Sequence, residues 1–288
     1  MTFEPFSITA PAKINLFLHI TGRRADGYHL LNTLIDFADS GSLACDRLDF
    51  APAEEFSLHI TGDFAAALRE EDPQQNLITR AAKTLCGSLP PVAVRLVKNL
   101  PVAAGIGGGS ADAAACLKGL SRLLEKHLPL DDAATLGADI PACLAGKPVL
   151  ARGIGEELHP VALPRYALLL VNPRKTLSTP DVFRRYAASD PAFHTGDSLA
   201  DAFSLEELIA CVTNSRNDLQ SAAAALMPEI GDVLHELEDQ HTCLAARMSG
   251  SGATCFGIFA DDKAAQSAEQ AIKTAHPDWW CAIAKTFS

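Results

Sequence analysis

The sequence predicts an α+β protein of two domains. Its 288 residues are enough for two domains of ordinary size. The first 60 residues are rich in strand-like segments, and the second half alternates strands with helices. Pro160 and Pro164 flank the expected boundary, so the predicted domains are residues 1–162 and residues 163–288.

The N-terminal half begins with a predicted strand over residues 13–20. Polar and apolar side chains alternate up to Leu16 and the rest is largely apolar, which is typical of a strand covered on one face. A loop is expected over residues 22–29. Further strands are predicted around three segments: 34–37, 43–50 and 56–60.

Asn76 marks the start of the first predicted helix, because Asn favours the N-cap position. This helix covers residues 77–85, and Gly87 and Pro90 end it. Residues 92–97 are rich in β-branched side chains and alternate in polarity, so a strand is expected there.

The segment that follows, residues 101–112, is the most informative in the chain: Pro-Val-Ala-Ala-Gly-Ile-Gly-Gly-Gly-Ser-Ala-Asp. Its clustered glycines let the backbone take positive φ and approach a ligand closely. Ser110 stands as a capping residue at the head of a helix that is expected to run to about His127, before Pro129. A glycine loop at a helix N-terminus presents unpaired N–H groups beside the positive end of the helix dipole, which favours phosphate.

This loop matches neither of the two common phosphate-binding motifs. No Lys follows Gly109, as a P-loop would require. Ser110 also stands where a dinucleotide fingerprint has its last glycine. The residues alone therefore leave two interpretations open, a phosphate loop and a plain glycine-rich turn.

The second half of the chain predicts a compact α+β arrangement of the ferredoxin-like type. A turn-rich segment at 137–146 and a hairpin at 149–161 precede it. Strands are expected at 166–171, as a pair around 249–259, and near 281–286. Helices are expected at 180–188, 204–213, 218–240 and 261–275.

Composition excludes several classes of protein. The chain is 48% hydrophobic and 20% charged, as in soluble globular proteins, and no apolar run reaches the length of a membrane span. The formal net charge of −11 argues against a nucleic-acid partner, which needs a basic face. The eight cysteines are dispersed without a metal-ligand spacing, which indicates reduced core residues. No signal peptide is recognisable, so the cytoplasm is the expected location.

Three motifs resemble those of the GHMP kinases, the family of galactokinase, homoserine kinase and mevalonate kinase. They are Pro-Ala-Lys-Ile-Asn-Leu-Phe-Leu at 11–18, the glycine loop and its helix at 101–114, and Ser-Gly-Ser-Gly-Ala-Thr-Cys-Phe at 249–256. Three shorter matches narrow the resemblance to members that act on diphosphocytidyl methylerythritol: residues 22–29, 137–141 and 217–219.

The resemblance implies the two-domain GHMP kinase fold, with an N-terminal domain like ribosomal protein S5 domain 2 and a ferredoxin-like C-terminal domain. It also implies phosphorylation of the substrate's 2-hydroxyl with ATP and Mg²⁺, in the non-mevalonate isoprenoid pathway. The substrate is then a small molecule, with no nucleic acid or membrane as partner. A monomer and a homodimer both stay open.

Two residues correspond to the catalytic pair of the family. Asp139 would accept the proton of the attacking hydroxyl. Lys13, as an ammonium beside it, would lower its pKa and stabilise charge on the hydroxyl and the γ-phosphate. Without the resemblance, Asp139 could serve only to shape the turn before Pro141, and Lys13 could be an exposed strand lysine.

The ATP-binding residues implied by the resemblance lie in and just before the glycine loop: Lys98, Pro101, Val102, Ala103, Ala104, Gly105, Ile106, Gly107, Gly108, Gly109, Ser110 and Ala111. For Lys98 the alternative is a solvated lysine at a strand end. The third motif, with Gly250, Ser251 and Gly252, is expected to support the site, although glycines in a hairpin turn look the same in isolation.

Four residues are assigned to the substrate. Asn15 lies on the same strand face as Lys13 and is expected to hydrogen-bond the substrate. Tyr28 would stack on cytosine, His29 would read its edge, and Phe183 would close the other side. The alternatives are surface positions for Asn15 and Tyr28, and a core contact for Phe183.

Three rival functions follow from the same residues. Another GHMP kinase, acting on homoserine or mevalonate, would keep the same loop. A catalytically silent metabolite sensor is disfavoured because both Lys13 and Asp139 are present. RNA binding on an S5-like fold is disfavoured by the acidic charge.

Overall fold

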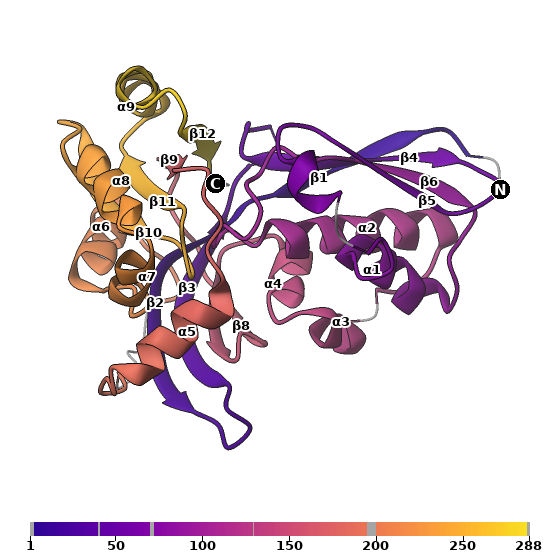
Figure 1. Cartoon of the computed structure of the whole chain (residues 1–288), viewed down its shortest axis with the longest axis horizontal. Coiled ribbons are helices and arrows are strands. Elements are labelled where there is room, and N and C mark those ends of the chain that lie inside the picture. The colour runs from indigo at the N-terminus through magenta and orange to yellow at the C-terminus, as the bar shows by residue number, and fades with distance from the viewer. Residues whose placement is uncertain (1–2, 40, 70–71, 129, 195–199, 287–288) are drawn as a thin grey trace. The chain divides into compact units, whose positions relative to one another are not determined.

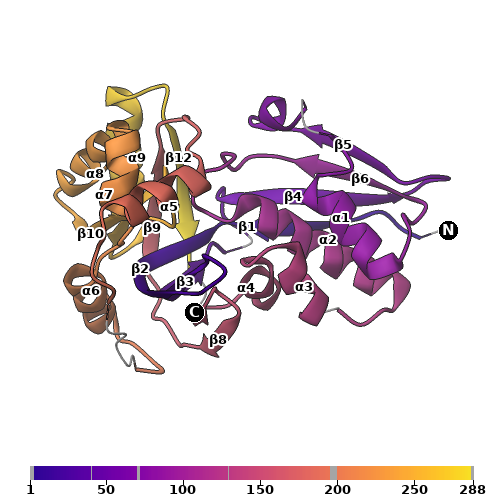
Figure 2. The same cartoon turned by 60° about the horizontal axis from the view of Figure 1, so that its bottom comes forward.

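The computed structural model describes residues 3–39, 41–69, 72–128, 130–194 and 200–286 (Figures 1 and 2). The chain forms two compact units, each built from separated segments. Unit 1 comprises Met1–Ala12, Cys45–Val102 and Gly107–Gly146, and unit 2 comprises Lys13–Ala44, Ala103–Ile106 and Lys147–Ser288.

A four-stranded sheet forms one layer of unit 1. Its strands are β1 (Phe6–Pro11), β4 (Cys45–Pro52), β5 (Ser57–Thr61) and β6 (Val92–Val97). They lie in the order β1-β4-β6-β5, with β4 antiparallel to both neighbours and β5 parallel to β6.

Helices cover one face of this sheet (Figure 1). They are α1 (Leu77–Cys86), α2 (Gly108–Leu124), α3 (Leu130–Leu136) and α4 (Ile140–Ala145), and a 3₁₀ turn, η1, spans Ala65–Leu68. Helix α2 packs tightly on β4 because Gly119 has no side chain: a Cβ there would lie 2.5 Å from Cζ of Phe50. Phe50 in turn stacks on Phe6 at 5.0 Å between ring centroids.

The start of α1 confirms the predicted cap. The Asn76 side chain accepts a hydrogen bond from the amide of Ile78 at 2.9 Å, and Gly87 ends the helix in the left-handed conformation at φ 77°.

Helix α2 follows the glycine loop as expected, but its predicted ends are wrong. It begins at Gly108, so Ser110 is its third residue and the N-cap position belongs to Gly107. It ends at Leu124, before Glu125 at φ 51°, rather than near His127. Helices α3 and α4 were not predicted; α4 lies within the segment expected to be turn-rich, where Pro141 fits the first turn.

Unit 2 contains an antiparallel sheet of β2 (Lys13–Arg23), β3 (His29–Phe37), β7 (Val149–Gly153) and β8 (Glu157–Pro160), in the order β2-β3-β7-β8. Strand β2 is buried throughout Lys13–Ile20, so the expectation of one covered face is wrong. Leu18 and Ile20 join the core of unit 2, and on the other face Phe17 packs against His19 at 4.8 Å.

The second sheet of unit 2 confirms the ferredoxin-like prediction. Its strands are β9 (Ala167–Asn172), β10 (Cys243–Met248), β11 (Cys255–Phe259) and β12 (Trp280–Lys285), all antiparallel in the order β10-β11-β9-β12. The accompanying helices are α5 (Thr179–Ala188), α6 (Leu205–Asn214), α7 (Gln220–Leu226), α8 (Glu229–Glu238) and α9 (Asp262–Ala275).

One predicted helix of this unit is in fact two. The expected helix over 218–240 is divided into α7 and α8 by Pro228, and Met227 before it has an extended backbone. Proline has no N–H to donate and disfavours helical geometry in the residue that precedes it.

The domain boundary between residues 162 and 163 stays a prediction. The two compact units are divided differently, because unit 2 includes segments from both sides of that boundary. Strand β7 pairs with β3, and β3 pairs with β2, so residues 149–153 belong to the same unit as residues 13–44. Among the described residues, no helix has the length and apolar character needed to cross a membrane.

Candidate functional site

The second half of the glycine loop, in unit 1, has the geometry of an anion site. Gly107 takes φ 61°, and the first backbone hydrogen bond of α2 runs from the Ala111 amide to the Gly107 carbonyl at 2.8 Å. The helix therefore supplies no partner for the amides of Gly108, Gly109 and Ser110. These three donors sit at the positive end of a helix of 17 residues, which favours a bound phosphate.

A buried ion cluster lies beneath this part of the loop. Lys98 Nζ donates to Asp46 Oδ2 at 2.5 Å and to Asp112 Oδ2 at 2.8 Å. All three side chains are at most 4% exposed, so the alternative of a solvated Lys98 is wrong. Gly108 rests directly on the cluster, because a Cβ there would lie 3.1 Å from Lys98 Nζ. Contact between Lys98 and a nucleotide stays a prediction.

The surroundings shift the pKa values of Asp112 and Lys98. Burial raises the pKa of Asp112 to about 8, although the Lys98 ammonium opposes that shift. Burial also disfavours the charge on Lys98, but the carboxylates of Asp112 and Asp46 together raise its pKa above the ordinary value. The two shifts favour a charged Lys98 and a protonated Asp112.

The first half of the loop, in unit 2, is fastened to β2 and to the third motif. Ser249 Oγ donates to the Gly105 carbonyl at 2.9 Å and accepts from the backbone amide of Asn15 at 3.0 Å. The amide of Lys13 donates to the Ile106 carbonyl at 2.9 Å. Gly105 needs to be glycine, since its φ is 74° and a Cβ would lie 2.6 Å from the Gly252 amide nitrogen.

The third motif forms the turn between β10 and β11. Gly250 and Gly252 take φ values of 54° and 82°, and Ser251 shares a hydrogen bond of 2.7 Å with the hydroxyl of Thr179. Asn217 holds this turn, because its Nδ2 donates to the carbonyls of Met248 at 2.8 Å and Gly250 at 2.7 Å. The turn therefore supports the segment Ala103–Ile106 within its own unit.

Lys13 and Asn15 lie together on β2, as predicted. Lys13 Nζ donates to Asn15 Oδ1 at 3.0 Å, and Asn15 Nδ2 donates to Thr33 Oγ1 at 2.8 Å. Their exposures of 4% and 2% make the alternatives of an exposed lysine and a surface asparagine wrong. Their roles toward a substrate stay predictions.

Asp139 occupies the N-cap position of α4 in unit 1. Its side chain makes no capping hydrogen bond to that helix, so helix capping does not account for it. The turn that carries it lies beside the glycine loop, because a Cβ on Gly137 would be 4.0 Å from Ser110 Oγ. Asp139 thus shares a unit with Gly107–Ser110, whereas Lys13 belongs to unit 2.

Two of the three residues assigned to cytosine come together in unit 2. The rings of His29 and Phe183 stack at 5.2 Å between centroids, and Phe183 also packs partly against the core. Burial and the nearby charge of Arg23 lower the pKa of His29. Tyr28 is 61% exposed on the turn between β2 and β3, where its ring is accessible.

A cavity of about 350 Å³ opens beside the N-terminus of α1 in unit 1. It is lined by Leu58, His59, Ile60, Leu68, Arg69, Pro73 and Asn76. The glycine loop reaches the same helix, since a Cβ on Gly109 would lie 3.6 Å from Cδ1 of Leu77.

Sequence reasoning missed Asp46 and Asp112 as members of the site. Asp112 was visible as a carboxylate in the second turn of the helix after the loop. Asp46 is 52 residues from Lys98 along the chain, and a single acidic residue in a strand gives no sign of a distant partner.

Comparison with known proteins identifies the family. The GHMP kinases N terminal domain matches residues 76–150, and the GHMP kinases C terminal domain matches residues 198–278. A 4-diphosphocytidyl-2-C-methyl-D-erythritol kinase of Cereibacter sphaeroides (strain KD131 / KCTC 12085) is 51% identical over 280 residues, covering 96% of this chain and 97% of the relative. Another from Rhizobium etli (strain CIAT 652) is 47% identical over 297 residues, covering 99% and 97%.

A solved structure agrees with these relatives. The crystal structure of a 4-(cytidine 5'-diphospho)-2C-methyl-D-erythritol kinase matches with a TM-score of 0.78 at 32% identity, covering 98% of this chain and 100% of that one. The resemblance found in the three motifs is therefore confirmed over the whole length. The chain belongs to the GHMP kinase family of ATP-dependent small-molecule kinases.

Proposed function

We propose that this kinase transfers the γ-phosphoryl group of ATP to the 2-hydroxyl of 4-diphosphocytidyl-2-C-methyl-D-erythritol, a step of the non-mevalonate isoprenoid pathway. The observation that carries the proposal is the likeness, over nearly the full chain, to proteins named as that kinase. The amides at the N-terminus of α2 support it, because they suit the phosphates of the donor.

Asp139 is the proposed acceptor of the hydroxyl proton, and Lys13 is proposed to stabilise the negative charge that develops during transfer. Asn15 would bind the acceptor's polyol beside Lys13. The fixed geometry of the Lys13–Asn15 pair supports this assignment, because phosphoryl transfer depends mainly on positioning and electrostatics.

The glycine loop is proposed to hold the phosphates of ATP, and the cavity at the start of α1 would take the nucleoside. Mg²⁺ would neutralise charge on the phosphates. Among the described residues, no three His, Cys, Asp or Glu side chains gather into a metal site. This fits Mg²⁺, which is usually held by few protein groups together with phosphate oxygens and water, and the Ser110 hydroxyl is an oxygen donor at the loop.

Tyr28, His29 and Phe183 are proposed to recognise cytosine. An accessible tyrosine ring and a stacked His–Phe pair offer apolar faces, and the neutral imidazole offers a donor and an acceptor to the base edge. These residues favour a cytidine substrate over homoserine or mevalonate, which have no aromatic group.

We place the reaction in the cytoplasm, with no nucleic acid as partner. The acidic net charge of −11 supports the absence of a nucleic-acid partner. The cysteines support the cytoplasmic location, because all eight lie among the described residues and none is in a disulfide. A monomer and a homodimer are both compatible with this proposal.

The test is an acceptor-dependent turnover assay. Purified protein with ATP and Mg²⁺ is expected to form ADP when the diphosphocytidyl substrate is added, and not with homoserine or mevalonate. ADP formation with one of the other acceptors instead would assign the chain to a different GHMP kinase. Binding of ATP without turnover of any acceptor would favour the silent sensor.

A further inference from the structure

The buried ion cluster joins the two ends of the glycine loop. Asp46 Oδ1 accepts the amides of Asn99 at 2.6 Å and Leu100 at 2.9 Å, where the chain leaves β6. Its Oδ2 accepts from Lys98, which also reaches Asp112 in the second turn of α2. One carboxylate and one ammonium thus connect the residues before the loop to the helix after it.

The cluster has an unbalanced charge. With both carboxylates ionised, the three side chains would carry a net charge of −1 beneath a loop built to bind an anion. They are buried, and Asp112 Oδ1 has no hydrogen-bond partner among the described residues. An ionised carboxylate oxygen without a partner is costly to bury, so the protonated form of Asp112 suits this environment.

We propose that Asp46, Lys98 and Asp112 are positioning residues for ATP: Asp46 and Lys98 set the spacing of the loop ends, and a proton on Asp112 keeps the cluster neutral while the phosphates are bound. This inference rests on the proposed function, because it requires the loop to bind ATP. It makes nucleotide affinity depend on the ionisation of a residue that does not touch the nucleotide.

The direction of the pH dependence follows from the groups that face Asp112. Burial raises its pKa to about 8, the neighbouring charge of Asp46 adds to the rise, and Lys98 opposes it. As pH increases through that value, Asp112 loses its proton and the cluster becomes negative. Phosphate binding weakens, and we expect the dissociation constant of Mg·ATP to rise about 3- to 10-fold between pH 7.5 and 9.

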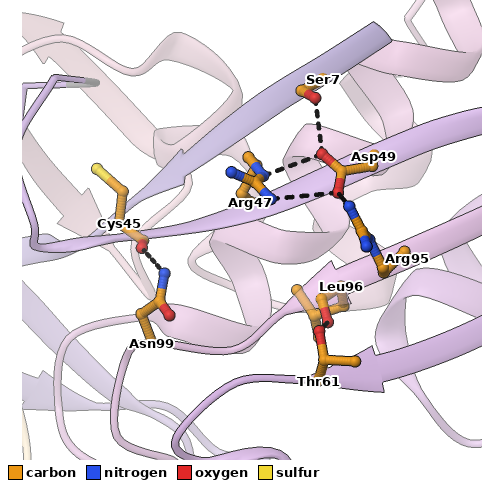
Figure 3. Close-up of polar contacts among 8 residues, drawn as sticks. All are labelled: Ser7, Cys45, Arg47, Asp49, Thr61, Arg95, Leu96 and Asn99. Carbon is orange, nitrogen blue, oxygen red and sulfur yellow. Dashed lines mark hydrogen bonds and ion pairs between the residues drawn. The ribbon is translucent and has the colours of Figure 1, made fainter. Parts of the chain in front are cut away.

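Strand β4 offers a matched control on its other face. Asp49 accepts from Ser7 Oγ at 2.6 Å and from the guanidinium of Arg95 at 2.7 Å, and it lies beside Arg47 (Figure 3). Arg47 and Arg95 are about half exposed, with side-chain exposures of 49% and 55%. Asp49→Asn removes the same charge from the same strand, yet leaves the loop untouched.

The experiment measures Mg·ATP affinity by calorimetry from pH 7.5 to 9 for the wild type and three variants. Asp112→Asn mimics the neutral acid, so its dissociation constant should stay flat within about twofold. Asp46→Asn removes the negative charge that helps hold the proton on Asp112. The pH at which the dissociation constant of Mg·ATP begins to rise should therefore be lower in this variant. Asp49→Asn should follow the wild type.

Each outcome decides the question. Wild-type affinity that is flat over this range, or an Asp112→Asn profile that rises like the wild type, overturns the proposal. If Asp46→Asn does not fold, as judged by circular dichroism, the Asp112→Asn profile decides alone. Wild-type protein that binds no ATP refutes the proposed function instead, so the two failures are distinct.

Discussion

The glycine-loop region and the proposed cytosine region differ in how their side chains are held. Around the loop, Lys98, Asp46 and Asp112 are at most 4% exposed and are paired with one another. On the turn between β2 and β3, Tyr28 is 61% exposed, while nearby His29 stacks on Phe183 and meets the ring of Tyr186 edge-on. The side chains around the loop are therefore fixed by burial and pairing, whereas the ring of Tyr28 is open to solvent.

This difference matches two separate tasks. Phosphoryl transfer depends on donors and charges that are fixed before the substrate arrives, since their reorganisation would raise the barrier. Recognition of a base can use an aromatic face that becomes ordered on binding. A buried ion cluster is a weak source of stability, so we expect the Lys98 cluster to matter more for loop geometry than for the free energy of unfolding.

The largest effect is expected at Asp139, the proposed base, which lies in the same unit as Gly107–Ser110 of the loop. Asp139→Asn keeps the size of the side chain and removes the basic oxygen, so kcat should fall by about 10²- to 10⁴-fold. ATP affinity, measured by calorimetry, should stay close to that of the wild type. Turnover within about threefold of the wild type would contradict the assignment of the base.

The next effect concerns the preset loop. Gly108→Val places a side chain against the Lys98 ammonium, where even a Cβ would be 3.1 Å away. We expect kcat/KM for ATP to fall by about 10²-fold, because the amides of the loop are displaced. Binding of the diphosphocytidyl substrate should change little.

Gly231→Val is the control for this variant. Gly231 lies in α8, and a Cβ there meets nothing within 4 Å. Its ATP parameters should equal those of the wild type. If Gly108→Val also keeps wild-type ATP affinity, the loop is only a turn.

A smaller effect is expected on the accessible side. Tyr28→Ala deletes a stacking face that would act equally in the ground and transition states, so KM for the diphosphocytidyl substrate should rise with kcat nearly unchanged. A stacking loss of about 1–3 kcal/mol corresponds to roughly 5- to 150-fold in kcat/KM. The ATP parameters should not change.

Tyr28→Phe should have the smallest effect, because it keeps the ring. Equal defects in the Ala and Phe variants would assign the interaction to the hydroxyl rather than to stacking. If neither variant has a defect, Tyr28 is a surface residue without a role in binding cytosine. The contrast between a buried loop region and an exposed base-binding region would then no longer hold.

Local patterns in the sequence predicted much of the fold. The Asn76 cap, the helix after the glycine loop and the alternation of strands and helices along the C-terminal half all depend on short-range signals. Pro228 also carries a local signal, since a proline within a long helical pattern indicates a break. The burial of β2 over Lys13–Ile20 depends on what packs on both of its faces, which the strand's own alternation does not reveal.

The sequence indicated the loop and the motifs of the candidate site, but it did not reveal how the buried charges beneath the loop are paired. Motif resemblance pointed to Lys98 and treated it as a residue near the nucleotide. Its two carboxylate partners come from a strand far away in the sequence and from the helix after the loop. Pairings of this kind require the folded arrangement of β4, β6 and α2, so no periodicity or composition could show them.

The central claim is phosphorylation of the 2-hydroxyl of the diphosphocytidyl substrate, and the most direct test is to identify the product. The protein is incubated with ATP, Mg²⁺ and the substrate labelled with carbon-13 at C2, and the product is examined by phosphorus-31 and carbon-13 NMR. We predict one new phosphomonoester, with phosphorus coupling at C2, formed in equal amount to ADP and absent with Asp139→Asn over the same time. ADP formation without a C2-linked phosphate, or a phosphate on another hydroxyl, would contradict this claim.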